Sequence, residues 1–292
     1  MQKSACVKIS RDSHWNFMAT FWELLPYDTE YDTPLPWHVS LPGPDNWHVS
    51  YPIAKGNNQS PVAILSKDVF KDPALLPWFT GYDPGAAKNI RNTGKILRIA
   101  FDDTFDRSVL RGGPLSGIYR LRQLQIHWGS TSDKGSEHVV DAKRHAGEIH
   151  LVHWNSSYSN YADALRKTDG VAIIAILMQV GKNPKPEMKR IIEEIDAIKT
   201  KGKEAPFPNF DPSILFPQNR SYYTYQGSFT MPPCEECVTW IVMKEPISVD
   251  EQQMLKLRSL SSNSAEDPHC PLQDNWRPLQ PLNNRMIRST CQ

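Results

Sequence analysis

Alternating side chains predict that much of this chain forms β-strands. Residues 119–128 and 148–155 alternate between two faces with the period of two residues that is typical of a strand. Residues 96–101 alternate in the same way and are followed by turn-forming residues. Residues 171–178, VAIIAILM, form an unbroken apolar run, which predicts a strand buried on both faces.

Helical periodicity is confined to two segments. In residues 185–199 the apolar side chains recur on one side and charged side chains on the other. Residues 248–260 offer a second helix, with Asp250 near its start as a cap. We therefore expect a mainly β (α+β) fold, one domain over residues 46–292 with short helices at its edges, after an irregular N-terminal extension over residues 1–45.

The composition excludes several classes of partner. The 292 residues include 33 Lys and Arg against 32 Asp and Glu, a formal charge of +1, so no overall field favours nucleic acid or an anionic membrane. No apolar run approaches the roughly 20 residues of a transmembrane helix. The first residues also lack the apolar core of a secretory signal. We expect neither a nucleic-acid nor a membrane partner.

The cysteines bear on the cellular compartment. They are five in number and scattered, which is more typical of free thiols in a reducing compartment than of a disulfide framework: Cys6, Cys234, Cys237, Cys270 and Cys291. Cys234 and Cys237 have the spacing of a redox pair but lack a helix-opening context, so we interpret them as ordinary cysteines. These observations predict a cytosolic protein; only composition supports a thiol-reactive role.

Histidines on the two alternating strands are the first candidates for chemistry. Alternation puts Gln123, Gln125 and His127 on one face of the first strand, and His150 and Val152 on one face of the second. Two imidazoles from neighbouring strands plus a third donor match the ligand count of a catalytic zinc site, whose fourth position stays open for water. Strand histidines are more often hydrogen-bonded core residues, so the pattern alone leaves both interpretations open.

Short motifs in a fixed order resemble those of the α-carbonic anhydrases. The resemblance covers residues 46–288, and its motifs are GNNQSP at 56–61, LRGGPL at 110–115, GSEH at 135–138, EIHLVHWN at 148–155, SFTMPP at 228–233, VTW at 238–240 and NWRPLQP at 275–281. Three more segments are similar to the slow, muscle-type cytosolic branch: FDDT at 101–104, IKTKGKEAPF at 198–207 and PPCEEC at 232–237.

The resemblance implies a lyase that uses zinc to hydrate carbon dioxide reversibly to bicarbonate and a proton. It implies a central, twisted, mostly antiparallel sheet of about ten strands, with the metal at the bottom of a conical cleft. Carbon dioxide and bicarbonate would be the small-molecule partners, and sulfonamides or anions would be inhibitors. The resemblance also implies a monomer.

The resemblance assigns roles to particular residues. His127 and His150 match two of the three zinc ligands, and Gln125 stands where the family has its first ligand histidine. Thr230 matches the gatekeeper threonine, which accepts a proton from the activated water and passes its own to a carboxylate. Glu137 matches that carboxylate.

Residues around these positions would form the substrate pocket. Carbon dioxide would lie against an apolar wall, with a polar wall opposite for proton exit. The resemblance places Val152, Ile174, Phe229, Met231 and Trp240 at the substrate pocket and Gln123 on the wet side.

Three features predict slow turnover even with zinc bound. Lys95 lies where fast members of the family keep a proton-shuttling histidine, and a lysine with a pKa of about 10.4 exchanges protons poorly near neutral pH. Phe229 should narrow the pocket beside Thr230. Arg98 and Arg122 add positive charge near its mouth.

Gln125 leaves two interpretations from different classes. An amide oxygen is a neutral and weaker donor to zinc than an imidazole nitrogen, so we expect zinc affinity to fall by about 4–7 kcal/mol. The first interpretation is a slow carbonic anhydrase, favoured by the intact His127, His150, Glu137 and Thr230. The alternative is a non-catalytic, carbonic anhydrase-related protein whose zinc site is weakened or lost and which acts as a binding module.

Overall fold

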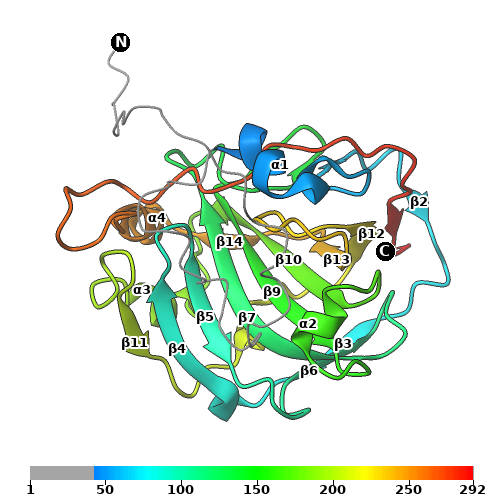
Figure 1. Cartoon of the computed structure of the whole chain (residues 1–292), viewed down its shortest axis with the longest axis horizontal. Helices are drawn as coiled ribbons and strands as arrows, with labels where there is room; N and C mark the ends of the chain where they lie inside the picture. Colours follow the sequence, from blue (N-terminus) through cyan, green and yellow to red (C-terminus); the bar gives the residue numbers. More distant parts are fainter. Residues whose placement is uncertain (1–42, 292) are drawn as a thin grey trace, which may run out of the picture. The chain divides into compact units, whose positions relative to one another are not determined.

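The computed structural model describes residues 43–291 (Figure 1). The predicted extension over residues 1–45 therefore lies almost entirely outside the described residues. Of the five cysteines, Cys6 also falls outside them.

A mixed, mostly antiparallel sheet of 13 strands forms the centre of the described structure, which confirms the mainly β fold. Ten strands form one continuous path, in the spatial order β11 (Glu204–Pro206), β4 (Ala87–Asn92), β5 (Leu97–Phe101), β7 (Ile118–Trp128), β9 (Gly147–Asn155), β10 (Val171–Val180), β13 (Val238–Met243), β12 (Tyr222–Gly227), β15 (Arg288–Ser289) and β2 (Phe70–Lys71). Off this path, β14 (Ile247–Val249) pairs with β10, and β3 (Trp78–Gly81) pairs with β6 (Val109–Gly112). A separate two-stranded sheet joins β1 (Ala63–Ile64) to β8 (Val139–Val140).

The predicted apolar strand runs through the middle of the sheet. β10 lies between β9, its antiparallel neighbour, and β13, with which it pairs in parallel (Figure 1). Residues 171–178 are all buried, as an unbroken apolar run requires when both faces of a strand are covered. Every residue of β9 is buried as well, so the strand that carries His150 is held rigidly on both sides.

The two faces of the sheet pack into separate apolar clusters. The larger cluster contains Leu124 and Leu151, which are partners across β7 and β9, together with Ile174 of β10. The smaller cluster contains Val152 and Trp240 and lies on the face that carries the candidate histidines. Alternation along each strand thus separates a structural core from a functional face.

Helices are few and short, as the sequence predicts. The segment 185–199 holds α3 (Met188–Ile192), and most of the rest of it is turns. The second predicted helix is α4 (Glu251–Arg258), where the carboxylate of Asp250 accepts from the main-chain N–H of Gln253 over 2.7 Å in a capping box. The remaining helical turns are η1 (Pro44–Asn46), α1 (Trp47–Ser50), η2 (Pro52–Lys55), η3 (Pro84–Ala86), α2 (Tyr161–Ala164) and η4 (Pro212–Leu215).

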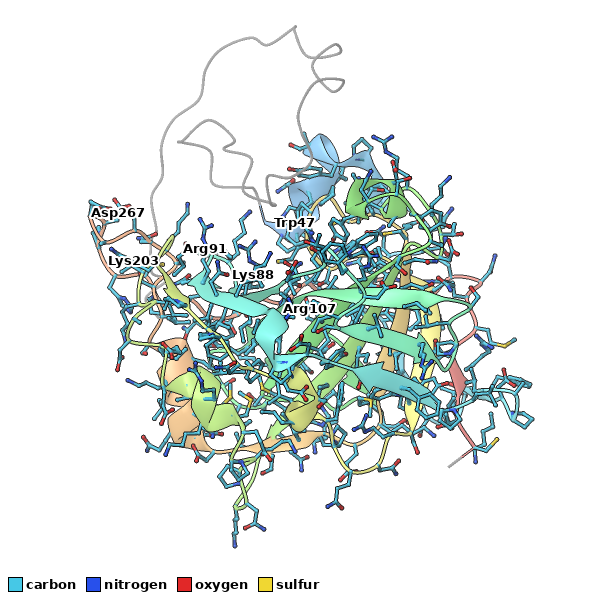
Figure 2. The ribbon with its side chains drawn as sticks, turned by 90° about the horizontal axis from the view of Figure 1, so that it is seen from below. Trp47, Lys88, Arg91, Arg107, Lys203 and Asp267 are labelled. Atoms are coloured by element: carbon cyan, nitrogen blue, oxygen red, sulfur yellow. The ribbon has the colours of Figure 1, made fainter. Side chains whose placement is uncertain are left out.

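Two surface observations bear on the predictions about partners. Within residues 43–291, no helix has the length and apolar character needed to cross a membrane. Lys88 and Arg91 of β4, with Lys203 just before β11, lie along one edge of the sheet (Figure 2). This is a local group of basic residues in a chain whose formal charge is only +1.

Candidate metal centre

The register between β7 and β9 brings the predicted polar residues to one face. Gln125 lies opposite His150, and His127 lies opposite Glu148. A register shift between Leu121 and Gln123 keeps the second half of β7 aligned with these partners. His127 is 0% exposed, His150 1% and Gln125 5%, so the three predicted ligands sit at the base of this face.

One hydrogen bond sets the tautomer of His127. Nδ1 lies 2.8 Å from the main-chain oxygen of Asn275, and because a carbonyl can only accept, Nδ1 carries the proton. Burial lowers the pKa of His127, which keeps the ring neutral. Nε2 therefore bears a lone pair, and this buried atom has no hydrogen-bond partner among the described residues. A buried ring nitrogen in this state is suited to bind a metal ion.

A carboxylate sets the tautomer of His150 in the same way. Nε2 of His150 lies 2.8 Å from Oε1 of Glu148. Burial alone would raise the pKa of Glu148, but the charge of His138 and hydrogen bonds from His138 and His150 hold it well below its usual range. Because an ionised carboxylate only accepts, Nε2 donates, which leaves Nδ1 as the ring nitrogen that could bind a metal.

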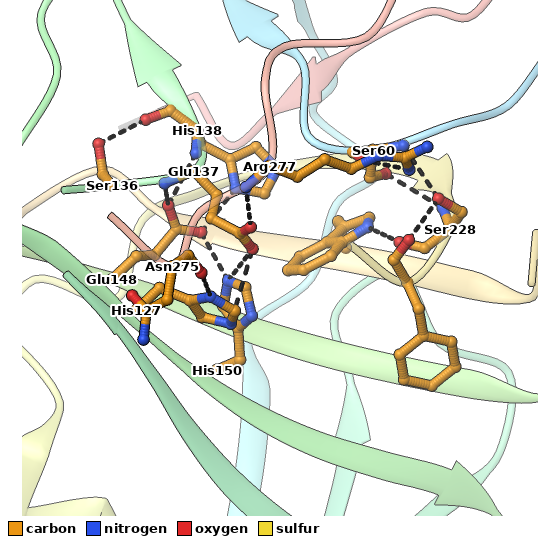
Figure 3. A network of polar contacts seen from close by, with 12 residues as sticks. Ser60, His127, Ser136, Glu137, His138, Glu148, His150, Ser228, Asn275 and Arg277 are labelled. Carbon is orange, nitrogen blue, oxygen red and sulfur yellow. Dashed lines mark hydrogen bonds and ion pairs between the residues drawn. The ribbon is translucent and has the colours of Figure 1, made fainter. Parts of the chain in front are cut away.

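Glu148 is itself held in place by the segment before β8. It accepts from the main-chain N–H groups of Glu137 and His138 over 2.9 and 2.8 Å, and from Nδ1 of His138 over 2.7 Å (Figure 3). Nε2 of His138 lies 2.7 Å from the hydroxyl of Tyr225. The orientation of the His150 ring is therefore fixed by a fully buried network.

A second buried carboxylate faces the two histidines. Oε1 of Glu137 accepts from the main-chain N–H of Arg277 over 2.8 Å, whereas Oε2 has no hydrogen-bond partner among the described residues. Oε2 lies 3.7 Å from Nε2 of His127 and 3.8 Å from Nε2 of His150 (Figure 3). His127, Glu137 and His150 each offer a ligand atom, and these atoms lie within 4.8 Å of one another.

A second group of potential ligands is less available. His138, Glu148 and His150 also converge within 4.8 Å. In this group, however, both histidines already donate to Oε1 of Glu148. A metal there would compete with the hydrogen bonds that His138 and Glu148 already make, whereas Nε2 of His127 and Oε2 of Glu137 have no partner among the described residues. The group of His127, Glu137 and His150 is therefore the better metal site.

The predicted proton relay is not formed in this structure. Thr230 is buried, at 4% exposure, as expected for a residue at the base of a cleft. Its hydroxyl does not donate to Oε2 of Glu137, because that oxygen lacks a hydrogen-bond partner within residues 43–291. The carboxylate instead has its free oxygen within 4 Å of both histidine rings.

The prediction that Ile174 belongs to the apolar wall of the pocket is wrong. Val152 of β9 lies opposite Ile173 of β10, and Ile173 lies opposite Trp240 of β13, so these three share the face of the metal site. Ile174 is on the other face and packs into the larger core cluster. Its neighbour Ile173 takes the wall position, because the side chains of a strand alternate. Phe229 packs in the same cluster as Val152.

The remaining predicted residues are spread around the site. Gln123 lies opposite Val152, and its amide nitrogen has no hydrogen-bond partner among the described residues. Lys95 is exposed in the turn between β4 and β5. Met231 is half-buried. Arg98 lies opposite Gln125, whereas Arg122 pairs with Asp103 over 2.7 Å.

The two buried thiols are poorly suited to chemistry. Cys234 and Cys237 are buried and unpaired. Burial raises the pKa of Cys234 to about 11 and that of Cys237 further, so both remain protonated near neutral pH.

Sequence reasoning gave no role to two residues that organise the site. Asn275 holds His127, and Arg277 holds Glu137. Both contacts use main-chain atoms, and because every residue has them, the residue types do not predict these contacts. The motif NWRPLQP that contains both residues was the available signal, but nothing in its spacing says which strand it touches.

Comparison with known proteins agrees with this geometry. The family model described as eukaryotic-type carbonic anhydrase matches residues 42–291. Carbonic anhydrase 3 of Sus scrofa is 56% identical over 240 residues, 82% of this chain and 92% of that protein. Carbonic anhydrase 3 of Homo sapiens is 55% identical over 253 residues, 87% of this chain and 97% of that protein. The match spans nearly the whole described structure, and the chain belongs to the eukaryotic-type carbonic anhydrase family.

Proposed function

We propose that this chain catalyses the zinc-dependent, reversible hydration of carbon dioxide to bicarbonate and a proton, at a slow rate. The observation that carries the proposal is a pair of buried imidazoles, each with one ring nitrogen held by a hydrogen-bond partner. Asn275 fixes His127 and Glu148 fixes His150. Membership of the carbonic anhydrase family supplies the reaction class.

The residues present fit a zinc ion. A catalytic zinc ion is held by three protein ligands, typically His nitrogens or carboxylate oxygens, and keeps a fourth position open for water. His127 offers a buried Nε2 that no described residue satisfies. His127 and His150 would hold the metal with a third donor from the same face, for which the sequence predicts Gln125. When bound, zinc supplies a Lewis acid that lowers the pKa of a water molecule towards neutrality.

The protein walls would hold the substrate. Val152, Ile173 and Trp240 pack together on the face that carries the histidines and would offer a dry wall suited to a nonpolar gas. Phe229 extends the same cluster and limits its size. This arrangement would keep carbon dioxide beside the metal without a polar group to bind it tightly.

Proton exit is the weak step of this site. The expected relay begins at the hydroxyl of Thr230, and Lys95 stands at the rim where a group titrating near neutral pH would serve better. A lysine is mostly protonated at pH 7 and so a poor proton acceptor. Together with Gln125 at the first ligand position, this supports slow turnover.

The cellular setting remains a proposal as well. Among the described residues, Cys234, Cys237 and Cys291 form no disulfide, which supports a reducing compartment such as the cytosol. A monomer is proposed from the family resemblance, with anions and sulfonamides as inhibitors of the zinc-loaded form.

Zinc content and hydration rate test the function together. The chain and its Gln125→His variant would be purified without added zinc, analysed for metal, and assayed for carbon dioxide hydration by stopped flow. We expect about one zinc ion per chain in Gln125→His and less in the unmodified chain, with measurable hydration by both after zinc loading. His150→Ala serves as the inactive control. Zinc-loaded forms that hydrate no faster than this control would overturn the proposal and favour a binding module.

A further inference from the structure

We propose that the carboxylate of Glu137, and not the amide of Gln125, is the third protein ligand of the metal. The site would then be a two-histidine, one-carboxylate site formed by His127, His150 and Glu137. The inference rests on the proposed function only in requiring a metal between the histidines; it does not require hydration activity.

The separation of the atoms already suits a shared metal. Oε2 of Glu137 lies 3.7 Å from Nε2 of His127. Two ligands at the usual zinc distances of 2.0–2.2 Å in a tetrahedral arrangement stand about 3.4 Å apart. A movement of a few tenths of an ångström would therefore bring these two atoms to one ion, which a side-chain rotation can supply. His150 would join them through Nδ1, because its Nε2 donates to Glu148.

The carboxylate oxygen is also available. Of the two buried carboxylates near the site, Glu148 accepts from two main-chain N–H groups and two imidazoles. Glu137 accepts one hydrogen bond, on Oε1 from Arg277, and its Oε2 has none among the described residues. A buried oxygen in this state is costly unless a ligand or a donor satisfies it. His127 presents a matching unsatisfied nitrogen on the other side of the 3.7 Å gap.

Charge favours the carboxylate over the amide. Glu137 is 0% exposed, where a divalent cation would be weakly screened and an anionic ligand would offset its charge. The amide of Gln125 carries no charge and is a weaker donor.

This ligand set has a consequence for the reaction. A carboxylate that binds the metal through Oε2 is not available to accept a hydrogen bond from Thr230 at that oxygen. The chain would thus gain metal affinity from Glu137 while losing its acceptor for the proton relay. Such a site would bind zinc and cobalt(II) better than Gln125 allows and still turn over slowly.

Zinc dissociation constants of matched variants test the inference. They would be measured by competition with a chromophoric chelator for the unmodified chain, Glu137→Gln and Gln125→Ala. We expect Glu137→Gln to weaken zinc binding at least about 100-fold and Gln125→Ala to change it by less than about 3-fold. Thermal unfolding of each metal-free variant controls for folding. If Glu137→Gln does not fold, Glu137→Asp replaces it, because the charge stays while the oxygen retracts by one methylene.

A double-mutant cycle distinguishes the loss of a metal ligand from a general loss of structure at the site. In the Gln125→His background an imidazole fills the third position, so Glu137→Gln should then change zinc affinity by less than about 3-fold. An equal loss in both backgrounds, or a larger loss from Gln125→Ala than from Glu137→Gln, would overturn the inference. Zinc binding with the expected pattern but without hydration would refute only the proposed function. Measurable hydration, together with zinc binding that depends on Gln125 and not on Glu137, would refute only this inference.

Discussion

Nδ1 of His127 donates a hydrogen bond to the main-chain oxygen of Asn275 over 2.8 Å. The side chain of Asn275 fixes that oxygen from two directions. Its Oδ1 accepts from the main-chain N–H of Trp128 over 2.8 Å, and its Nδ2 donates to the main-chain oxygen of Lys95 over 2.9 Å. The ligand ring is thus oriented by a loop that is itself tied to β7 and to the turn between β4 and β5.

Asn275→Ala should weaken metal binding although it leaves the carbonyl in place. Without its two side-chain anchors, the carbonyl would be less well positioned to hold His127. We expect zinc affinity to fall by about 10-fold, the lower end of the range for residues that orient a ligand. Chelator competition measures the loss, and Asn275→Asp, which keeps the acceptor for Trp128, should lose less. Unchanged affinity in Asn275→Ala would show that the loop holds its position without these bonds.

Two adjacent isoleucines should separate the substrate wall from the core. Ile173 lies with Val152 and Trp240, whereas Ile174 packs on the other face. Ile173→Ala and Ile174→Ala should each lower the free energy of unfolding by about 2–4 kcal/mol. Only Ile173→Ala should change kcat/KM for carbon dioxide, by about 10-fold, since it alters the surface beside the metal.

The measurement uses the zinc-loaded Gln125→His background, in which we expect the highest rates. Denaturant unfolding of both variants verifies that the stabilities match. A change in kcat/KM for Ile174→Ala as large as that for Ile173→Ala would contradict the assignment of the wall.

Lys95→His should accelerate hydration when proton exit limits the rate. Lys95 is exposed in the turn between β4 and β5, and a histidine there would titrate near its usual pKa of about 6.5. In the zinc-loaded Gln125→His background we expect kcat to rise by about 3- to 10-fold at pH 7 in dilute buffer. Concentrated imidazole buffer should remove the difference, because it carries the protons instead. A difference that persists in concentrated buffer would mean that Lys95 affects the rate by a route other than proton exit.

The buried His153 should make the metal-free protein less stable in mild acid. Burial lowers the pKa of His153 from 6.5 to about 3, and its Nε2 lies 2.8 Å from the hydroxyl of Tyr82. Since the unfolded chain binds this proton first, the stabilisation is complete above about pH 6.5 and is lost as the pH falls towards 3. Between pH 8 and pH 5 the free energy of unfolding should drop by about 2 kcal/mol through this residue.

His153→Gln is the matched variant, because glutamine can still bond to Tyr82 but does not titrate. Denaturant unfolding of both proteins at pH 8 and pH 5, with a chelator present, gives the comparison. Equal pH dependence in the two proteins would assign the acid sensitivity to other groups, such as His127 and His145, whose pKa values burial also lowers.

The sequence predicts the strands of the site well and its contacts less well. Alternation places Gln125 and His127 on one face, and the register of β7 with β9 confirms it. The run 171–178 is apolar at every position, so it carries no period that says which residues face the metal. Only pairing with Val152 and Trp240 shows that Ile173 belongs to the wall.

The orientation of the Glu137 carboxylate could not be predicted from the sequence for a different reason. Its motif predicts a carboxylate near Thr230, but the direction in which a carboxylate points depends on the donors around it. Those donors include the main-chain N–H of Arg277, which is 140 residues distant in the chain. No local pattern encodes such a contact, and it becomes visible only when the chain is folded.

The surroundings of Arg277 link the start of the described chain to the metal centre. Its guanidinium donates to the main-chain oxygens of Ala54 and Ser60 over 3.1 and 2.9 Å and lies 5.4 Å from the centre of the Trp47 ring. Its main-chain N–H positions Glu137. A change that displaced Trp47 or the turn after it would therefore act on a carboxylate of the candidate metal centre. Substitutions near Trp47 would therefore change the zinc affinity of the site although they leave every proposed ligand in place.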